Sequence, residues 1–265
     1  MGRRKLKVWA CRILLTFLLQ PIVVYADTVR YAVTNESWEP YWIVRDGHVS
    51  GIFSDVMLAL DQQMDVALEA ETPQPPLRAQ KHFREAMVQL ECCVSKAWRS
   101  AADQVEVSLW SEPVLSTEEV LIFPPGKAFP FTRLQDLRGR TISTVRGYGY
   151  AGSQYFTRSD SPNSIAQLKV VARRRVDAGI IDRLELASLF ASHPDIPALS
   201  ASMELGPVIS RSELRIRLHR SRAELLEPLN TAISRLRKDG TLAMIVQRYA
   251  VPLRDEAGML HTKQF

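Results

Sequence analysis

Beyond its N-terminal segment, the sequence lacks any apolar run long enough to cross a membrane, which takes about 20 residues. The one apolar run, residues 13–24, follows a basic segment and ends in the small-residue segment Val24-Tyr25-Ala26. This order is typical of a secretory signal peptide. An uncleaved anchor is less favoured because Gln20-Pro21 interrupts an already short run. We therefore expect cleavage before Asp27, which releases a periplasmic protein with no stable membrane insertion.

An excess of one sign of charge is also lacking once residues 1–26 are set aside. The whole chain has 34 Lys and Arg against 29 Asp and Glu, and five of the basic residues but no acid lie in that segment. The remaining chain therefore carries 29 residues of each sign. This balance gives no indication of binding to nucleic acid or to a membrane surface. The basic run 173–175 is better explained as the solvated end of a helix.

Cysteine is scarce, and only Cys92 and Cys93 follow residue 26. In an oxidising compartment the two could form a disulfide, but adjacent residues close a strained ring. Two buried thiols at the start of a strand are the favoured alternative. Neither arrangement predicts a metal site.

Recognisable catalytic motifs are absent as well. The histidines do not have the spacing of a metal pair, and none has an evident nucleophile as a partner. They are His48, His82, His193, His219 and His261. We therefore expect no metal, no cofactor and no enzymatic activity.

What the sequence does contain is an alternation of strand and helix patterns. In the first half we expect a helix with Ser54 as its N-cap, a second helix at 78–90, and strands at 28–34, 67–71, 92–95 and 119–123. In the second half we expect a helix at 164–174, two C-terminal helices, and strands at 141–145, 179–182 and 213–219. This α/β order favours a mostly parallel sheet covered by helices.

The strongest break in composition is Pro124-Pro125-Gly126. The chain that remains after residue 26 has about 240 residues, which exceeds a usual single domain of about 100–200. We therefore place a lobe boundary at this break. The expected organisation is a signal peptide at 1–26, the first part of lobe 1 at 27–123, lobe 2 at 124–206, and a return to lobe 1 with C-terminal helices at 207–265.

Five sequence segments occur in a characteristic order. They are 29–41 followed by Gly51-Ile52-Phe53, then Trp110-Ser111-Glu112-Pro113, 137–142, 175–182, and the stretch from Leu229 to Tyr249. In this order they resemble the family 3 extracellular solute-binding proteins, the amino-acid-type receptors of ABC importers. The resemblance implies a two-lobed α/β fold of the type II periplasmic-binding-protein kind. Each lobe would be a mostly parallel sheet flanked by helices, and hinge strands near 119–123 and 203–210 would join the two lobes.

The resemblance also implies two charged ligand-binding residues. Arg99 corresponds to the arginine that binds a carboxylate, which a guanidinium can hold by two parallel hydrogen bonds. Asp182 corresponds to the acid that binds an ammonium group, and it ends a buried-looking strand at the edge where open α/β sheets bind ligands. Each residue has a plainer alternative. Arg99 could lie in a surface loop, and Asp182 could be the N-cap of the helix that begins near Leu184.

A loop and several aromatic residues complete the expected site. Gly147 and Tyr148 follow a strand, and glycine there would let backbone N–H groups approach an anionic group, or would serve only the turn. Trp38, Tyr41 and Trp98 offer flat surfaces for stacking, although some aromatic residues must belong to the core.

We therefore expect a periplasmic receptor for a small amphiphilic solute, an amino acid or a derivative of one. It would act as a monomer and deliver its ligand to the permease of an ABC transporter. Two alternatives stay open. One is a dehydratase-like periplasmic enzyme of the same fold that uses an acid in the cleft as a proton donor. The other is a soluble partner that reports ligand occupancy to a membrane sensor.

Overall fold

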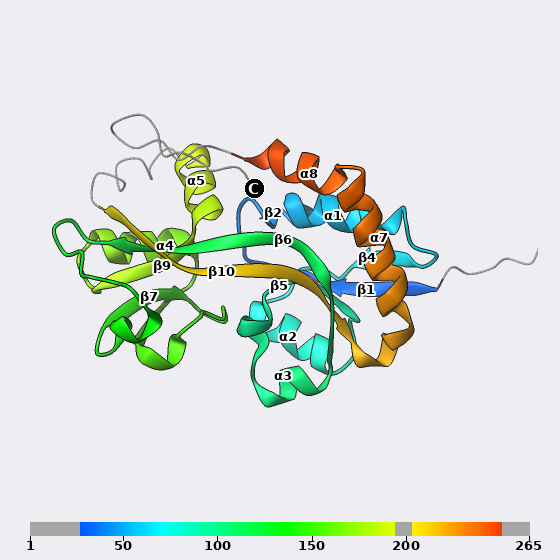
Figure 1. Cartoon of the computed structure of the whole chain (residues 1–265), viewed down its shortest axis with the longest axis horizontal. Coiled ribbons are helices and arrows are strands. Elements are labelled where there is room, and N and C mark those ends of the chain that lie inside the picture. Colours follow the sequence, from blue (N-terminus) through cyan, green and yellow to red (C-terminus); the bar gives the residue numbers. More distant parts are fainter. Residues whose placement is uncertain (1–26, 194–202, 251–265) are drawn as a thin grey trace, which may run out of the picture.

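The computed structural model describes residues 27–193 and 203–250 and consists of two lobes joined by two long strands (Figure 1). The expected signal peptide, residues 1–26, lies outside the described residues. Within the described ranges, no helix is both long enough and apolar enough to span a bilayer.

The first lobe is built on three parallel strands covered by helices on both faces (Figure 1). In it β1 (Thr28–Ala32) pairs with both β4 (Ala67–Ala70) and β5 (Leu90–Val94). A hairpin of β2 (Ile43–Arg45) and β3 (His48–Ser50) lies beside this sheet. The helical segments are α1 (Ile52–Asp61), α2 (Pro76–Arg84), η1 (Lys96–Arg99), α3 (Ala102–Glu106), η4 (Arg220–Leu225), α7 (Leu226–Lys238) and α8 (Thr241–Tyr249).

The second lobe repeats this plan on a smaller scale. Its central strand β7 (Thr141–Val145) pairs in parallel with β8 (Thr157–Ser161) and β9 (Ala178–Asp182). The helical segments are η2 (Leu134–Leu137), η3 (Ser153–Tyr155), α4 (Ser164–Ala172) and α5 (Arg183–Ser192). The predicted two-lobed α/β fold, with parallel strands in each lobe, is confirmed.

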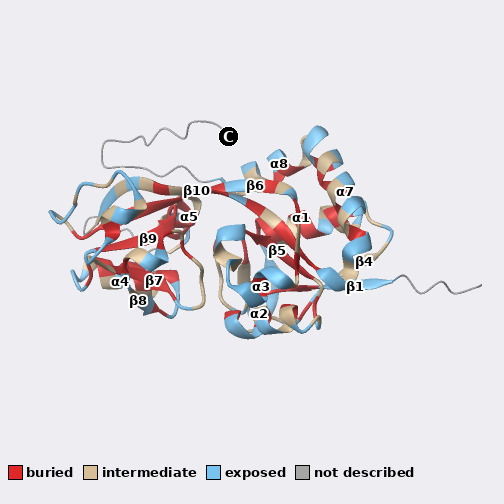
Figure 2. Ribbon diagram, turned by 60° about the horizontal axis from the view of Figure 1, so that its bottom comes forward, coloured by how far each residue is buried: buried red, intermediate tan, exposed pale blue. Residues whose placement is uncertain are grey.

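Two antiparallel strands of 16 residues, β6 (Ser108–Phe123) and β10 (Glu204–His219), run through both lobes and make one continuous sheet. In Figure 2, buried residues follow this sheet through each lobe. Val114 and Leu214 belong to the first-lobe core, whereas Val120 and Ile209 belong to second-lobe cores. We therefore propose that the chain changes lobe before Val120 on β6, and between Ile209 and Leu214 on β10.

The predicted N-cap at Ser54 is wrong because α1 begins one turn earlier, after Gly51. Gly51 has a φ of 105°, and a β-carbon there would stand 2.7 Å from the backbone oxygens of Pro40 and Tyr41. Only glycine fits this close approach.

The predicted helix at 78–90 is also too long, since α2 ends at Arg84. Ala86 takes a positive φ of 57°, which an α-helix cannot contain. The chain then turns into β5, where Leu90 is buried.

Candidate functional site

A cavity lies between the lobes, at the carboxyl ends of β5 and β9. Its empty volume is about 850 Å³, part of which is open to solvent. Residues of both lobes line it, and so does Glu119 of the connecting strand β6. Ligand sites are expected at such a place, since a cleft between lobes encloses a small molecule on several sides.

The structure brings five of the seven predicted site residues onto the cavity wall. They are Trp38, Trp98, Arg99, Tyr148 and Asp182. Ligand contact by these residues stays a prediction, but they come from segments far apart in the sequence and converge on one space.

Tyr41 does not line the cavity and lies one layer behind it. Its side chain is fully buried, and its hydroxyl group is 2.9 Å from the hydroxyl of Thr117. Thr117 in turn donates a hydrogen bond to the carboxylate of Asp182. The position of Tyr41 suits it to orient Asp182.

Gly147 also lies away from the cavity wall, where its carbonyl oxygen accepts a 3.1 Å hydrogen bond from Gln80 of the first lobe. The glycine that reaches the cavity is Gly149. A β-carbon at position 149 would stand 2.6 Å from the Cα of Trp98 on the opposite lobe. The loop therefore uses one glycine for its turn and another for a close approach between the lobes.

On the first-lobe side, Arg99 is held by Glu91, a residue that sequence analysis missed. Both Nε and Nη2 of Arg99 donate to the Glu91 carboxylate, with the shortest distance 2.5 Å. The same carboxylate accepts a 3.0 Å hydrogen bond from the fully buried Arg217. Burial alone would raise the pKa of Glu91, but the two guanidinium groups lower it below its ordinary value. Two cations therefore surround one anion.

The second-lobe side carries three buried carboxyl groups, those of Glu119, Asp182 and Glu185. Glu119 and Asp182 are directly opposite each other on the antiparallel strands β6 and β9. Ser210 donates to Glu119 at 2.5 Å, and the backbone N–H of Glu185 donates to Asp182 at 2.9 Å. Among the residues that the structure describes, none of the three carboxyl groups forms an ion pair.

Burial raises the pKa of these three carboxyl groups. The pKa of Glu119 and that of Asp182 are each raised to about 7, and that of Glu185 to about 8. Hydrogen bonds from Ser164 and Trp38 to Glu185 oppose the shift without cancelling it. Near neutral pH this side of the cavity can therefore hold protons that a bound cation would displace.

Both roles considered for Asp182 find support in the geometry. Its side chain caps α5 through the hydrogen bond from Glu185, and the residue also lines the cavity. A cap needs only one carboxylate oxygen, and the role of ligand partner stays a prediction.

Aromatic side chains form much of the wall between the two charged ends. The ring centroid of Trp38 lies 5.7 Å from that of Trp98 and 6.4 Å from that of Tyr148. Trp42 and Phe53 line the cavity too. The indole Nε1 of Trp98 is buried and has no hydrogen-bond partner within the described part of the chain.

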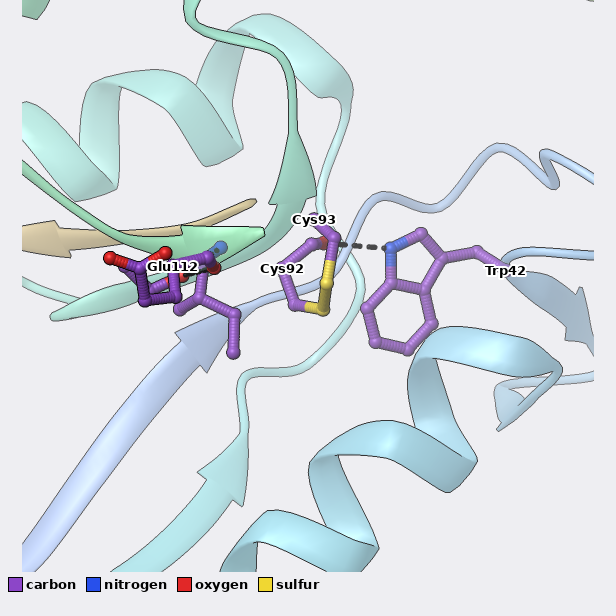
Figure 3. Close-up of a disulfide and its surroundings, with 6 residues drawn as sticks. Trp42, Cys92, Cys93 and Glu112 are labelled. Atoms are coloured by element: carbon purple, nitrogen blue, oxygen red, sulfur yellow. Dashed lines mark hydrogen bonds between the residues drawn. A yellow bond between two sulfur atoms is a disulfide. The ribbon is translucent and has the colours of Figure 1, made fainter. Parts of the chain in front are cut away.

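The favoured expectation of two thiols at Cys92 and Cys93 is wrong, since the two residues form a disulfide on the cavity wall (Figure 3). That expectation was based on the strained ring that a disulfide between adjacent residues closes. In the structure the peptide between them is cis and their Cα atoms are 3.0 Å apart. Trp42 donates from its indole Nε1 to the carbonyl oxygen of Cys92 at 3.2 Å.

No protein-family model matches the chain. In sequence it is 29% identical over 122 residues to the L-cystine-binding protein TcyJ of Escherichia coli K12. This alignment covers 43% of each protein, which is less than half the length of that relative.

Solved structures match over most of the chain. An ancestral arginine-binding protein bound to arginine has a TM-score of 0.65 and 16% identity, and the match covers 84% of this chain and 97% of that one. A histidine kinase sensor domain with similarity to periplasmic binding proteins has a TM-score of 0.66 and 16% identity, with 84% and 95% covered. At 16% sequence identity these matches establish the fold alone.

Proposed function

We propose, on the basis of the fold and of the partial sequence match to a cystine-binding protein, that this chain is a periplasmic receptor for an amino acid or a derivative of one. The observation that carries the proposal is the distribution of charge along the cavity between the lobes. One end is cationic and the other is rich in carboxyl groups, as a zwitterionic ligand requires.

The cationic end is formed by Arg99, Glu91 and Arg217, which together carry one net positive charge. Arg99 lines the cavity, whereas Arg217 is fully buried behind it. A ligand carboxylate beside Arg99 would share the guanidinium with Glu91 and balance the remaining charge.

The other end offers the carboxyl groups of Asp182, Glu119 and Glu185 to a ligand ammonium group. An ammonium group there would supply the cation that these buried carboxyl groups lack, and it would favour their ionised forms. The aromatic residues between the two ends suit the non-polar part of an amphiphile.

Contacts between the lobes support a receptor that closes around its ligand. Gln80 of α2 donates to the carbonyl of Gly147 at 3.1 Å, and Ser192 of α5 donates to Glu39 at 3.2 Å. These contacts are polar and their residues belong to none of the hydrophobic cores, so they can break without disturbing either core. Bending of β6 and β10 would then open the cavity.

We further propose that the receptor is a monomer that delivers its ligand to the permease of an ABC importer. Reporting to a membrane sensor is the second candidate, since a histidine kinase sensor domain shares the fold. We propose no catalytic role. The sequence relative is named as a binding protein, and so is the arginine-bound structural neighbour.

A ligand screen tests the proposed function. The protein would be melted in the presence of each of the twenty standard L-amino acids and of L-cystine, and every hit would be titrated by calorimetry. At least one should raise the melting temperature and bind with one-to-one stoichiometry. Small-angle scattering of the saturated protein should then show a smaller radius of gyration. If no amino acid binds, the proposed function is wrong.

A further inference from the structure

The disulfide between Cys92 and Cys93 has one side in the first-lobe core and the other on the cavity. It lies within β5, where the hydrogen bond from Trp42 fixes the backbone of Cys92 (Figure 3). Both cysteine residues are almost fully buried, with exposed fractions of 3% and 0%. The sulfur atoms are therefore held in place beside the space that a ligand would occupy.

A cross-link at this position does little for the stability of the fold. Disulfides stabilise proteins mainly by restricting the unfolded chain, and the effect grows with the number of residues in the closed loop. Cys92 and Cys93 are neighbours and enclose no segment of chain. This disulfide therefore has a role other than stabilising the fold by cross-linking distant parts of the chain.

The surroundings of the disulfide within the cavity are aromatic. Trp38, Trp42 and Trp98 of the first lobe line the same space, and Trp38 also donates a hydrogen bond to Glu185. Sulfur is soft and polarisable, and its contacts with aromatic and apolar groups are favourable. The disulfide and the indole rings together form a wall suited to the non-polar part of a ligand.

We propose that this disulfide is a ligand contact that selects amino acids with large apolar or sulfur-containing side chains, and that its reduction weakens their binding. The inference rests on the proposed function, because it concerns the same cavity. In the oxidised state the disulfide forms a compact apolar part of the cavity wall, and a ligand would reach it through the small exposed surface that Cys92 keeps. This surface would pack against the ligand side chain while the charged ends of the cavity hold its ammonium and carboxylate groups.

Reduction changes that surface chemically. A dithiol reductant gives up two electrons and two protons and becomes a disulfide, while the bond between Cys92 and Cys93 breaks and each sulfur gains one proton. The two thiol sulfurs can no longer remain at bonding distance. They must move apart within a wall that is packed against Trp42, and they bring two S–H groups toward an apolar ligand side chain.

Calorimetry on the wild type and on the double variant Cys92→Ser/Cys93→Ser tests the inference. The probes are L-methionine, L-leucine and L-cystine, with L-alanine as the small-side-chain control. The oxidised wild type should bind at least one of the first three at least tenfold more tightly than L-alanine. The double variant should lose about tenfold in affinity for that probe, which corresponds to about 1.4 kcal/mol, and little for L-alanine.

A second measurement keeps the test decisive if the double variant does not fold. Dithiothreitol would reduce the wild type with and without the tighter-binding of L-methionine and L-leucine, since L-cystine would itself be reduced, and the new thiols would be alkylated and counted by mass spectrometry over time. A ligand that covers the disulfide should slow reduction at least fivefold. L-Alanine at the same concentration should give a much smaller effect.

The possible outcomes separate the inference from the proposed function. If a probe binds the wild type and the double variant equally and does not slow reduction, the inference is wrong and the proposed function stands. The same holds if only small or charged amino acids bind. If no amino acid binds the oxidised wild type, both fail.

Discussion

The two walls of the cavity bury carboxyl groups in opposite ways. On the first lobe, Glu91 lies between Arg99 and Arg217, and these cations hold its pKa below the ordinary value. On the second lobe, Asp182 and Glu185 are equally buried but have no cation, and their pKa values are raised to about 7 and about 8. On one wall the buried carboxylate already has its cations within the protein, and the cluster keeps one net positive charge. The other lacks a positive charge that a ligand can supply.

This difference separates stability from binding. A buried charge whose partner belongs to the protein stabilises the fold only while the pair is intact. A buried carboxyl group without a partner destabilises the fold when it ionises, and this penalty is relieved when a cationic ligand arrives. Substitutions on the first lobe should therefore affect folding most, and substitutions on the second lobe should affect ligand affinity most.

The largest expected effect is on folding, from Glu91→Gln. The variant leaves Arg99 and Arg217 without their shared anion, and Arg217 has no access to solvent. Breaking a buried ion pair in this way costs about 3–5 kcal/mol. Denaturant unfolding measures the loss. Glu69→Gln, at an exposed position of β4, is the matched control and should change the free energy of unfolding by less than about 0.5 kcal/mol. Equal stability of the two variants would contradict the assigned role of Glu91.

The next largest effect is on affinity, from Asp182→Asn. The amide oxygen can still accept the hydrogen bond from Glu185, but the negative charge opposite the ligand ammonium is gone. A hydrogen bond to a charged group contributes about 1.5–3 kcal/mol, or roughly ten- to more than hundredfold in affinity. Calorimetry with the tightest-binding amino acid measures this loss of affinity. Asp46→Asn, in the exposed turn between β2 and β3, should bind like the wild type. If Asp182→Asn binds the ligand as tightly as the wild type, Asp182 serves only as the N-cap of α5.

A smaller loss of ligand affinity is expected from Gly149→Ala, which tests whether the two lobes close around the ligand. The added methyl group would meet the backbone of Trp98 at 2.6 Å only while the lobes are together. Overpacking costs about 1–3 kcal/mol, which would weaken binding roughly five- to hundredfold while leaving the unfolding of the open protein nearly unchanged. Gly126→Asn, where a β-carbon has no neighbour within 4 Å, is the control. Tight binding by Gly149→Ala would show that the observed approach of the lobes is not required.

A pH dependence of the ligand-free protein is also expected. The folded-state pKa of Asp182, about 7, lies above its ordinary value of 3.8. The folded protein therefore binds more protons than the unfolded chain between about pH 4 and pH 7, and this contribution to stability is lost as pH rises through that window. The melting temperature should fall less over this window in Asp182→Asn than in the wild type. Ligand affinity should rise over the same window, since an ammonium group prefers the ionised carboxylates. Parallel melting profiles would contradict the raised pKa.

The sequence predicted the fold well because strand and helix periodicity is local. Arg99 and Asp182 were predicted through the family resemblance, and both line the cavity. The sequence did not identify Glu91, which lies within an apolar strand and has its second partner, Arg217, 126 residues away. Such a pairing leaves no local pattern. Gly149 was not selected over Gly147 because only the packed lobes show which glycine faces the opposite wall.

The cysteine pair also could not be assigned from the sequence. Cys92 and Cys93 read as apolar strand residues, and sequence alone could not show that their backbone brings the two sulfur atoms together. Their position on the cavity wall depends on the second lobe, whose residues are far away in the chain.

The most direct test of the central claim varies the ligand instead of the protein. The best amino acid from the screen would be compared by calorimetry with two analogues, its amide, which lacks the carboxylate, and its deaminated acid, which lacks the ammonium group. A cavity with one cationic and one carboxyl-rich end should bind each analogue at least tenfold more weakly than the parent amino acid, a loss of about 1.4 kcal/mol or more. Binding of either analogue as tightly as the parent would contradict the account, because one charged end of the cavity would then have no part in recognition.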